Sequence, residues 1–104
     1  MDAWVYILRC ADGRYYVGSH RGPDVLVRVA QHQAGWDSKS FTHGRRPVEL
    51  VWAERFQRII DAIAYERRLK GWSRAKKEAL IVGDWAELQR LAQSREPRPS
   101  TGSG

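Results

Sequence analysis

The sequence predicts a small α/β protein of the α+β type, with a three-stranded, largely antiparallel sheet flanked by helices in the order ββαβααα. Three observations favour this class. Short segments rich in β-branched and aromatic residues lie in the first half of the chain, and a hairpin signal joins the first two. Helical periodicity with capping residues dominates the second half. The length of 104 residues suits one domain.

The first two strands form a predicted hairpin. Residues 4–9 (WVYILR) are β-branched and aromatic, which is typical of a strand. Asp12-Gly13 is a tight-turn signal, and residues 14–18 (RYYVG) supply the returning strand. Tyr6 and Tyr16 are then expected to face each other on neighbouring strands.

A helix follows Pro23 and Asp24, which suit the positive end of a helix. Val25, Val29 and His32 share one face at helical spacing, and Gly35 indicates the end of the helix. Residues 36–46 (WDSKSFTHGRR) read as a polar loop before a third strand over 48–53.

Three further helices complete the predicted domain, residues 1–93. Ser73 and Asp84 are expected N-caps of the last two. The tail from Ser94 lacks apolar residues, and we expect residues 94–104 to be disordered. The predicted helices span 59–70, 74–82 and 85–92.

Composition limits the classes of function. Eighteen Lys and Arg against twelve Asp and Glu give a net charge of +6, and fourteen of the eighteen are arginine, whose planar fork matches phosphate oxygens. Five tryptophans and four tyrosines add stacking surface for nucleic acid. The single Cys10 excludes an internal disulfide, and the sequence shows neither a signal peptide nor a membrane-spanning run. We therefore expect a cytoplasmic protein without a membrane partner.

Glu66 occupies an unusual position in the second predicted helix. Ile59, Ile63, Glu66 and Lys70 follow the spacing of one helical stripe, so a carboxylate stands where a core side chain is expected. A buried charge without a partner would cost several kcal/mol. Either a divalent cation compensates it, or Glu66 forms an i,i+4 salt bridge with Lys70 on a solvated edge.

Paired tripeptides and a helical motif together resemble the GIY-YIG endonuclease superfamily. Trp4-Val5-Tyr6 is followed, after nine residues, by Tyr16-Val17-Gly18, and the first tripeptide departs from the family name at Trp4 and Val5. Arg28 is followed four residues later by His32, and Glu66 precedes Lys70-Gly71 and Ser73. The match spans about residues 3–82 and is most similar to the small stand-alone single-domain bacterial members with a URI-type domain.

This resemblance implies a metal-dependent DNA endonuclease that hydrolyses phosphodiester bonds in DNA repair, recombination or processing. The implied catalytic residues are Tyr6, Tyr16, Arg28, His32 and Glu66, with Glu66 holding one Mg²⁺ or Mn²⁺ ion. From the residues alone, plainer roles stay open. Each tyrosine can be strand packing, the arginine stem can lie across the surface, and the histidine can be a structural hydrogen-bonding group.

DNA contacts are expected from polar and basic residues outside this set, and Arg45 and Arg46 can equally belong to a solvated loop. A small catalytic domain offers little surface for reading bases, which favours single-stranded or branched DNA over a specific duplex sequence. A protein partner is compatible with the sequence. The alternatives are a catalytically weak or inactive nucleic-acid-binding module of the same fold, and a protein-interaction domain. The residues expected to contact DNA are Ser19, His20, Lys39, Arg45, Arg46 and Lys70.

Overall fold

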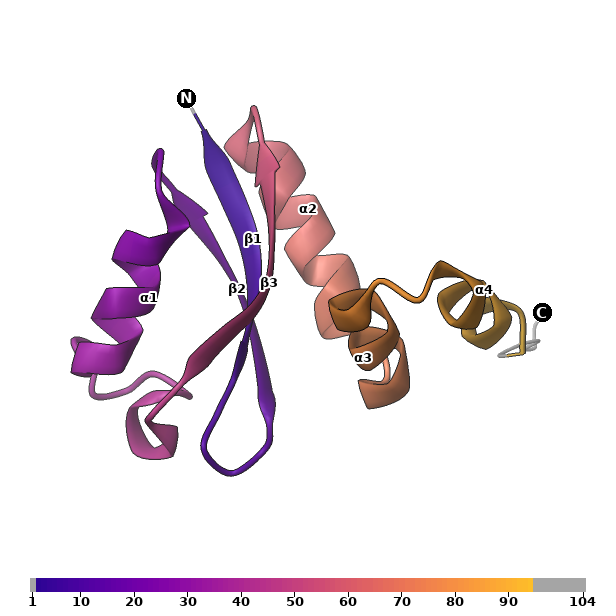
Figure 1. The fold of residues 1–104 in the computed structure, drawn as a ribbon. Helices are drawn as coiled ribbons and strands as arrows, with labels where there is room; N and C mark the ends of the chain where they lie inside the picture. Colours follow the sequence, from indigo (N-terminus) through magenta and orange to yellow (C-terminus); the bar gives the residue numbers. More distant parts are fainter. Residues whose placement is uncertain (1, 95–104) are drawn as a thin grey trace. The chain divides into compact units, whose positions relative to one another are not determined.

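A computed structural model describes residues 2–94 of the chain. Its elements follow the predicted order ββαβααα, and the sheet is antiparallel throughout (Figure 1). The internal contacts gather in two compact units, Met1–Gly71 with the sheet and two helices, and Trp72–Gly104 with the other two. The predicted α+β class is confirmed.

The sheet has the strand order β2-β1-β3, with β1 (Ala3–Arg9) in the centre. β2 (Tyr15–Arg21) and β3 (Glu49–Phe56) are its edges. Both edge strands run three residues further than the sequence predicts, because pairing continues to the start of β1, where Ala3 lies opposite both Arg21 and Phe56. Residues 19–21, which follow the predicted end of the second strand at Gly18, therefore belong to β2.

One face of the sheet packs against α1 (Val25–Ala34). Asp24, expected near the positive end of this helix, is its N-cap, since its carboxylate accepts a hydrogen bond from the Leu26 amide at 2.9 Å. Gly35 ends the helix with φ 73°, a left-handed conformation that favours glycine. Side chains alternate between the two faces of a strand, so every second residue of β1 points toward α1. The buried cluster on this face contains Tyr6, Leu8, Cys10, Val25 and Val48.

The other face of the sheet packs against α2 (Ile59–Lys70), as Figure 1 shows. The buried residues of α2 are Ala62 and Leu69, and Tyr65 stacks on Trp52 with ring centroids 6.1 Å apart. Ile63 is 37% exposed, so the stripe expected through Ile59 and Ile63 is wrong. The buried face of α2 instead contains Ala62 and Leu69, and Glu66 lies beside this face with its side chain 15% exposed.

The second unit contains α3 (Arg74–Val82) and α4 (Trp85–Ser94). Both predicted caps are confirmed: Ser73 accepts from the Lys76 amide at 3.2 Å, and Asp84 from the Glu87 amide at 3.0 Å. α4 reaches Ser94, two residues past its predicted end. Of the tail expected to be disordered over 94–104, Ser94 belongs to α4, and residues 95–104 lie outside the described residues. Within 2–94, no helix is long and apolar enough to cross a membrane.

Candidate active site

The two tyrosines of the paired tripeptides point to the α1 face of the sheet. Tyr6 lies opposite Gly18 and Tyr16 opposite Leu8, and residues paired in this way share a face. Their rings are therefore diagonal neighbours, with centroids 6.3 Å apart, rather than directly opposite as expected. The hairpin register brings both phenols into one cluster.

Gly18 makes room for the Tyr6 phenol. A Cβ atom at this position would lie 2.5 Å from the Tyr6 hydroxyl and 2.9 Å from a ring carbon of Tyr16. Because glycine has no side chain, the phenol can lie over the edge strand β2. The glycine of the second tripeptide is thus required by packing rather than by backbone conformation.

Tyr6 is fully buried and bonded to His32. Its side chain is 0% exposed, and its hydroxyl oxygen lies 2.8 Å from His32 Nε2. Burial raises the pKa of Tyr6 to about 12, against the opposing influence of the Arg28 guanidinium. The free protein therefore carries a protonated Tyr6 at neutral pH.

His32 is held between β1 and the loop that follows α1. It is 7% exposed, and its Nδ1 lies 2.8 Å from the Thr42 hydroxyl, which in turn lies 3.1 Å from the Ser40 hydroxyl. Burial, followed by the charge of Arg28, lowers the pKa of His32, while Asp37 raises it. His32 is therefore neutral near pH 7.

Arg28 brings a positive charge to the same cluster. It lies one helical turn before His32, and its guanidinium donates to the neutral Gln31 side chain at 3.0 Å. Its Nε is buried without a hydrogen-bond partner, and no carboxylate of residues 2–94 lies within ion-pair distance of it. A partly buried cation without an anionic partner suits an anionic ligand.

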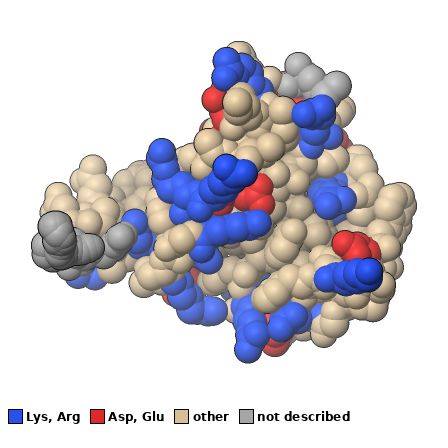
Figure 2. Space-filling model, turned by 180° about the vertical axis from the view of Figure 1, so that it is seen from behind, with Lys and Arg blue, Asp and Glu red and all other residues tan. Residues whose placement is uncertain are grey.

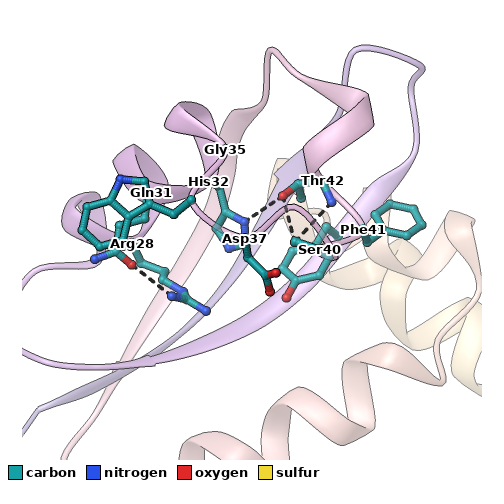
Figure 3. Close-up of a pocket in the computed structure, with 10 residues that line it drawn as sticks. Arg28, Gln31, His32, Gly35, Asp37, Ser40, Phe41 and Thr42 are labelled. Carbon is teal, nitrogen blue, oxygen red and sulfur yellow. Dashed lines mark hydrogen bonds between the residues drawn. The ribbon is translucent and has the colours of Figure 1, made fainter.

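A pocket of about 160 Å³ opens beside these residues. α1 forms one wall and the polar loop forms the other, with Arg28 and His32 facing Ser40 and Thr42 across it (Figure 3). The volume accommodates a few waters or a phosphate group but not a whole nucleotide. It is lined by Tyr16, Arg28, Gln31, His32, Gly35, Trp36, Asp37, Ser40, Phe41 and Thr42.

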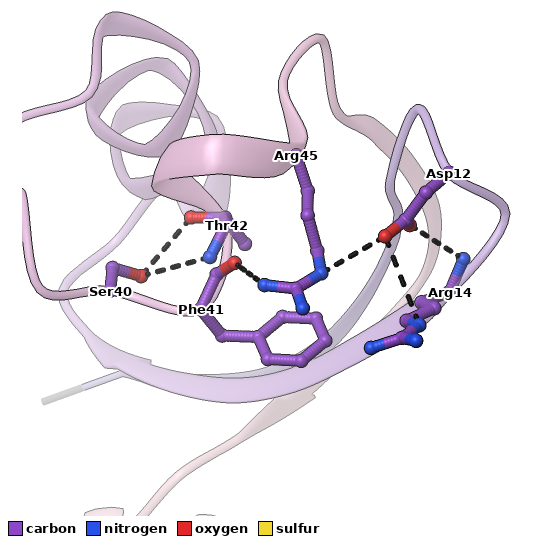
Figure 4. Close-up of polar contacts among 6 residues, drawn as sticks. All are labelled: Asp12, Arg14, Ser40, Phe41, Thr42 and Arg45. Atoms are coloured by element: carbon purple, nitrogen blue, oxygen red, sulfur yellow. Dashed lines mark hydrogen bonds and ion pairs between the residues drawn. The ribbon is translucent and has the colours of Figure 1, made fainter.

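Arg45 fixes the loop wall to the β1–β2 hairpin. Its Nε donates to Asp12 at 3.0 Å, another guanidinium nitrogen donates to the Phe41 carbonyl at 2.8 Å, and the guanidinium lies 3.9 Å from the centre of the Phe41 ring (Figure 4). Arg46 donates to the His43 carbonyl at 2.8 Å. Both arginines expected to contact DNA thus bind groups of the protein itself.

The other residues expected to contact DNA lie in three places. Lys39 is exposed in the loop. Ser19 and His20 point to opposite faces of β2, and His20 shares the face of Tyr6. Burial and then the charge of Arg28 lower the pKa of His20, which places it near the cluster. Lys70 ends α2 and pairs with Glu66.

Glu66 stands apart from the rest of the expected catalytic set. Its side chain is 15% exposed and accepts an ion pair from Lys70 at 2.7 Å, the bridge that its spacing allowed. Within residues 2–94, no hydrogen bond or ion pair joins it to Arg28 or His32. Its charge still contributes to the raised pKa of Tyr6. The rings of Tyr6, Tyr16 and His32 are neighbours, Arg28 lines the same pocket as Tyr16 and His32, and Glu66 is related to this group through the effect of its charge on Tyr6.

The donor set restricts the kind of metal ion that Glu66 could hold. Within residues 2–94, no group of three His, Cys, Asp or Glu side chains is arranged to hold a metal. Zinc-type sites need three or four protein ligands, so they do not fit. Magnesium binds through one or two carboxylates and is completed by water and substrate phosphates, so one carboxylate fits that chemistry.

Sequence reasoning missed the residues of the loop wall. Asp37, Ser40 and Thr42 lie in a segment without periodicity, and no spacing relates them to His32. Their polar character, in a short stretch that also contains the aromatic residues Trp36 and Phe41, was the available signal.

Beyond the pocket, Lys and Arg side chains lie in several separate groups over the face drawn in Figure 2, and Asp or Glu side chains lie beside several of these groups.

Known proteins resemble this chain in sequence and in fold. A family model described as the GIY-YIG catalytic domain matches residues 2–79. A UPF0213 protein of Natronomonas pharaonis is 46% identical over 83 residues, which are 80% of this chain and 94% of that protein. A UPF0213 protein of Halobacterium salinarum is 47% identical over 77 residues, 74% of this chain and 96% of that protein.

Two solved structures share the fold. The solution NMR structure of a UPF0213 protein from Bacillus halodurans has a TM-score of 0.50 at 35% identity and covers 88% of this chain and 98% of its own. A solution NMR structure of an E. faecalis protein has a TM-score of 0.51 at 23% identity, covers 96% of each chain, and shows the fold alone. With the family model and the relatives in agreement, the chain belongs to the GIY-YIG catalytic domain family and, within it, to the UPF0213 proteins.

Proposed function

We propose that this protein is a metal-dependent DNA endonuclease that hydrolyses phosphodiester bonds and favours single-stranded or branched DNA. Family membership points to nuclease-type chemistry on a nucleic acid, usually with a divalent metal ion. The observation that carries the proposal for this chain is the cation of Arg28, which has no anionic partner among residues 2–94 and lies beside two phenols and a neutral histidine at a pocket of phosphate size.

Arg28 is the residue proposed to bind the scissile phosphate. Its fork of donors matches two non-bridging oxygens, and their negative charge grows in the transition state. Gln31, its neutral partner, holds the guanidinium without cancelling its charge. A carboxylate in the place of Gln31 would compete with the phosphate, so the neutral partner favours anion binding.

Tyr16 is the phenol proposed to orient the attacking water. It lines the pocket and is half-buried, whereas Tyr6 is fully buried and bonded to His32. A protonated Tyr6 with a pKa of about 12 is a poor base in the free protein. His32 is the proposed neutral base of the cluster, because it lines the same pocket as Tyr16 and its Nε2 is bonded to Tyr6.

Glu66 is the residue proposed to hold the metal ion. Bound there, Mg²⁺ or Mn²⁺ would stabilise charge on the phosphate and the leaving oxygen as a Lewis acid. Glu66 must then exchange its ion pair with Lys70 for the metal. The Lys70 ammonium, once released, is free to contact the DNA backbone.

The preference for unpaired DNA rests on Trp36. This side chain is 75% exposed at the rim of the pocket, so its ring is available to stack on a base. The ring of Phe41, by contrast, packs against both Arg45 and Tyr16. One free aromatic ring beside a phosphate-sized pocket suits a nucleotide whose base is not in a duplex.

The experiment is a cleavage assay on labelled single-stranded, branched and duplex DNA, with Mg²⁺ and with a chelator. We expect Arg28→Gln and Glu66→Gln each to lower cleavage about 10²-fold or more, the usual effect of losing one group that stabilises transition-state charge. Arg9→Gln and Glu49→Gln are matched controls, because they remove the same charges from an exposed ion pair. Trp36→Leu should weaken cleavage of single strands more than any cleavage of duplex.

Two results would overturn this proposal. Undiminished cutting by both Arg28→Gln and Glu66→Gln would refute the residue roles. Binding of DNA by the folded wild-type protein without metal-dependent cleavage of any substrate would favour the inactive binding module.

A further inference from the structure

Thr42 is the most completely buried polar side chain beside the proposed catalytic cluster, and none of the roles above uses it. It is 1% exposed, and its hydroxyl lies between His32 Nδ1 at 2.8 Å and the Ser40 hydroxyl at 3.1 Å (Figure 3). Thr42 lines the pocket, but the contacts of its hydroxyl are with His32 and Ser40. We therefore expect its effect on catalysis to pass through His32.

The hydrogen positions in this chain follow from what each group can donate. Among the described residues, the hydrogen-bond partners of the Tyr6 hydroxyl are His32 Nε2, at 2.8 Å, and the guanidinium of Arg28. A guanidinium only donates, so the Tyr6 proton must point to Nε2. A neutral imidazole that accepts at Nε2 carries its proton on Nδ1.

Thr42 is the acceptor that this tautomer needs. The Nδ1–H of His32 donates to the Thr42 oxygen, and the Thr42 hydroxyl then donates to Ser40. In the opposite tautomer, Nε2–H would face the Tyr6 oxygen, and the Tyr6 proton would have Arg28 beside it, which cannot accept. The alternative therefore leaves a buried donor without a partner, which is costly.

The loop that carries Thr42 is fixed from both sides. The Arg45 amide donates to the Thr42 carbonyl at 3.0 Å, and the Ala11 amide of the β1–β2 hairpin donates to the Arg45 carbonyl at 2.9 Å. The Arg45 side chain bonds to Asp12 and to the carbonyl of Phe41, the residue before Thr42 (Figure 4). The hairpin thus holds the Thr42 hydroxyl at a constant position against the imidazole.

From these contacts we propose that Thr42 is a positioning residue that holds His32 in the Nδ1–H tautomer, so that Nε2 can accept the Tyr6 proton. The effect of Thr42 on cleavage rests on the proposed nuclease function, whereas its effect on the tautomer of His32 does not. His32 would have the same tautomer in a protein that only binds DNA.

The test measures the tautomer and the catalysis separately. Long-range ¹⁵N–¹H NMR of the ¹⁵N-labelled full chain at neutral pH reports which imidazole nitrogen of His32 carries the proton. We expect Nδ1–H in the wild type, a shift toward Nε2–H in the near-isosteric Thr42→Val, and restoration in Thr42→Ser. Ser38→Ala, which removes an exposed hydroxyl from the same loop, is the matched control and should change nothing.

In cleavage assays Thr42→Val should lower kcat about tenfold or more with KM changed less than about twofold, as for an interaction that acts only in the transition state. Thr42→Ser should recover most of the rate. An Nε2–H tautomer in the wild type, which needs no variant to measure, would overturn the assignment, as would Nδ1–H retained in folded Thr42→Val. The shifted tautomer with an unchanged kcat would overturn the catalytic role. Absence of cleavage by the wild type would refute the proposed function and leave the NMR test of Thr42 intact.

Discussion

Arg28 sets the charge environment of three titratable side chains at once. Its guanidinium favours negative and disfavours positive charge, so it acts to lower the pKa of Tyr6, His32 and His20 alike. For both histidines burial is the larger cause, and for Tyr6 burial acts in the opposite direction and is stronger. The result is a neutral cluster around one cation, which is the charge state that suits a phosphate ligand.

Replacing Arg28 by glutamine is therefore expected to raise the pKa of His32 and of His20 in an NMR titration, while both stay below the ordinary value of 6.5 because burial persists. Arg28→Lys keeps the charge and should leave both values close to those of the wild type. Unchanged histidine pKa values in Arg28→Gln would show that the guanidinium is not near the rings.

The sign of the linked stability follows from the same shift. The pKa of His32 is lower in the folded than in the unfolded state, so its contribution to stability is present above pH 6.5 and is lost as the pH falls through the folded-state pKa. In urea unfolding, the wild type should lose stability on acidification below pH 6.5. Arg28→Gln should lose less, because its His32 takes up a proton more readily in the folded state.

Among the elements, β2 is both an edge strand of the sheet and the strand that carries Tyr16, and Gly18 is important for the packing of both tyrosines. The strand is paired only with β1 among the described strands, and it carries Tyr16 two residues before Gly18. The missing side chain at Gly18 lets the Tyr6 phenol cross the strand toward His32. The paired tripeptides are thus one packing unit, in which a residue of β2 sets the position of a residue of β1.

Gly18→Ala is expected to displace the Tyr6 phenol, since the added methyl would lie 2.5 Å from its hydroxyl. Overpacking of this kind costs about 1–3 kcal/mol of stability, and the loss of the Tyr6–His32 bond should lower cleavage as well. Gly44→Ala is the matched control, because a Cβ there meets nothing within 4 Å. Urea unfolding and the cleavage assay check both variants; equal stability and activity of Gly18→Ala and the wild type would contradict the packing argument.

The elements that the sequence predicted well are those with a local signal. Ser73 and Asp84 cap helices where expected, and Asp24 lies at the positive end of its helix as expected, because these positions depend only on the turn that follows them. Strand ends depend on a partner strand, and β2 and β3 ran past their expected ends for that reason. Thr42 bonds to His32 from a loop that the Arg45–Asp12 contact fixes to the β1–β2 hairpin. Such a contact between distant segments leaves no local pattern in the sequence.

The site residues show the same difference between positions that a local pattern predicts and positions that depend on distant contacts. Arg28 and His32 are one turn apart on one helix, so their proximity could be inferred from spacing. Glu66 could be placed beside the core but not relative to the other four, because α2 covers the opposite face of the sheet from α1 (Figure 1). Its partner among the described residues is Lys70, the alternative that the spacing had left open.

At the scale of the whole molecule, a net charge of +6 attracts DNA, whereas one carboxylate attracts a divalent cation only weakly. The proposed metal ion would therefore need phosphate oxygens of the substrate to complete its ligands. Binding of metal and of DNA must then be coupled, and the coupling acts equally in both directions.

This coupling predicts that Mn²⁺ binds the free protein weakly and binds the protein–DNA complex more tightly. The measurement is the fraction of free Mn²⁺ by electron paramagnetic resonance, using Arg28→Gln to suppress cleavage while Glu66 stays intact. DNA binds Mn²⁺ by itself, so the control is the double variant Arg28→Gln/Glu66→Gln on the same strand. Extra Mn²⁺ should bind only where Glu66 is present, and Mn²⁺ should tighten DNA binding of the single variant by the same factor. Equal Mn²⁺ uptake by the two complexes would remove Glu66 as the metal ligand, because its carboxylate is the only difference between them.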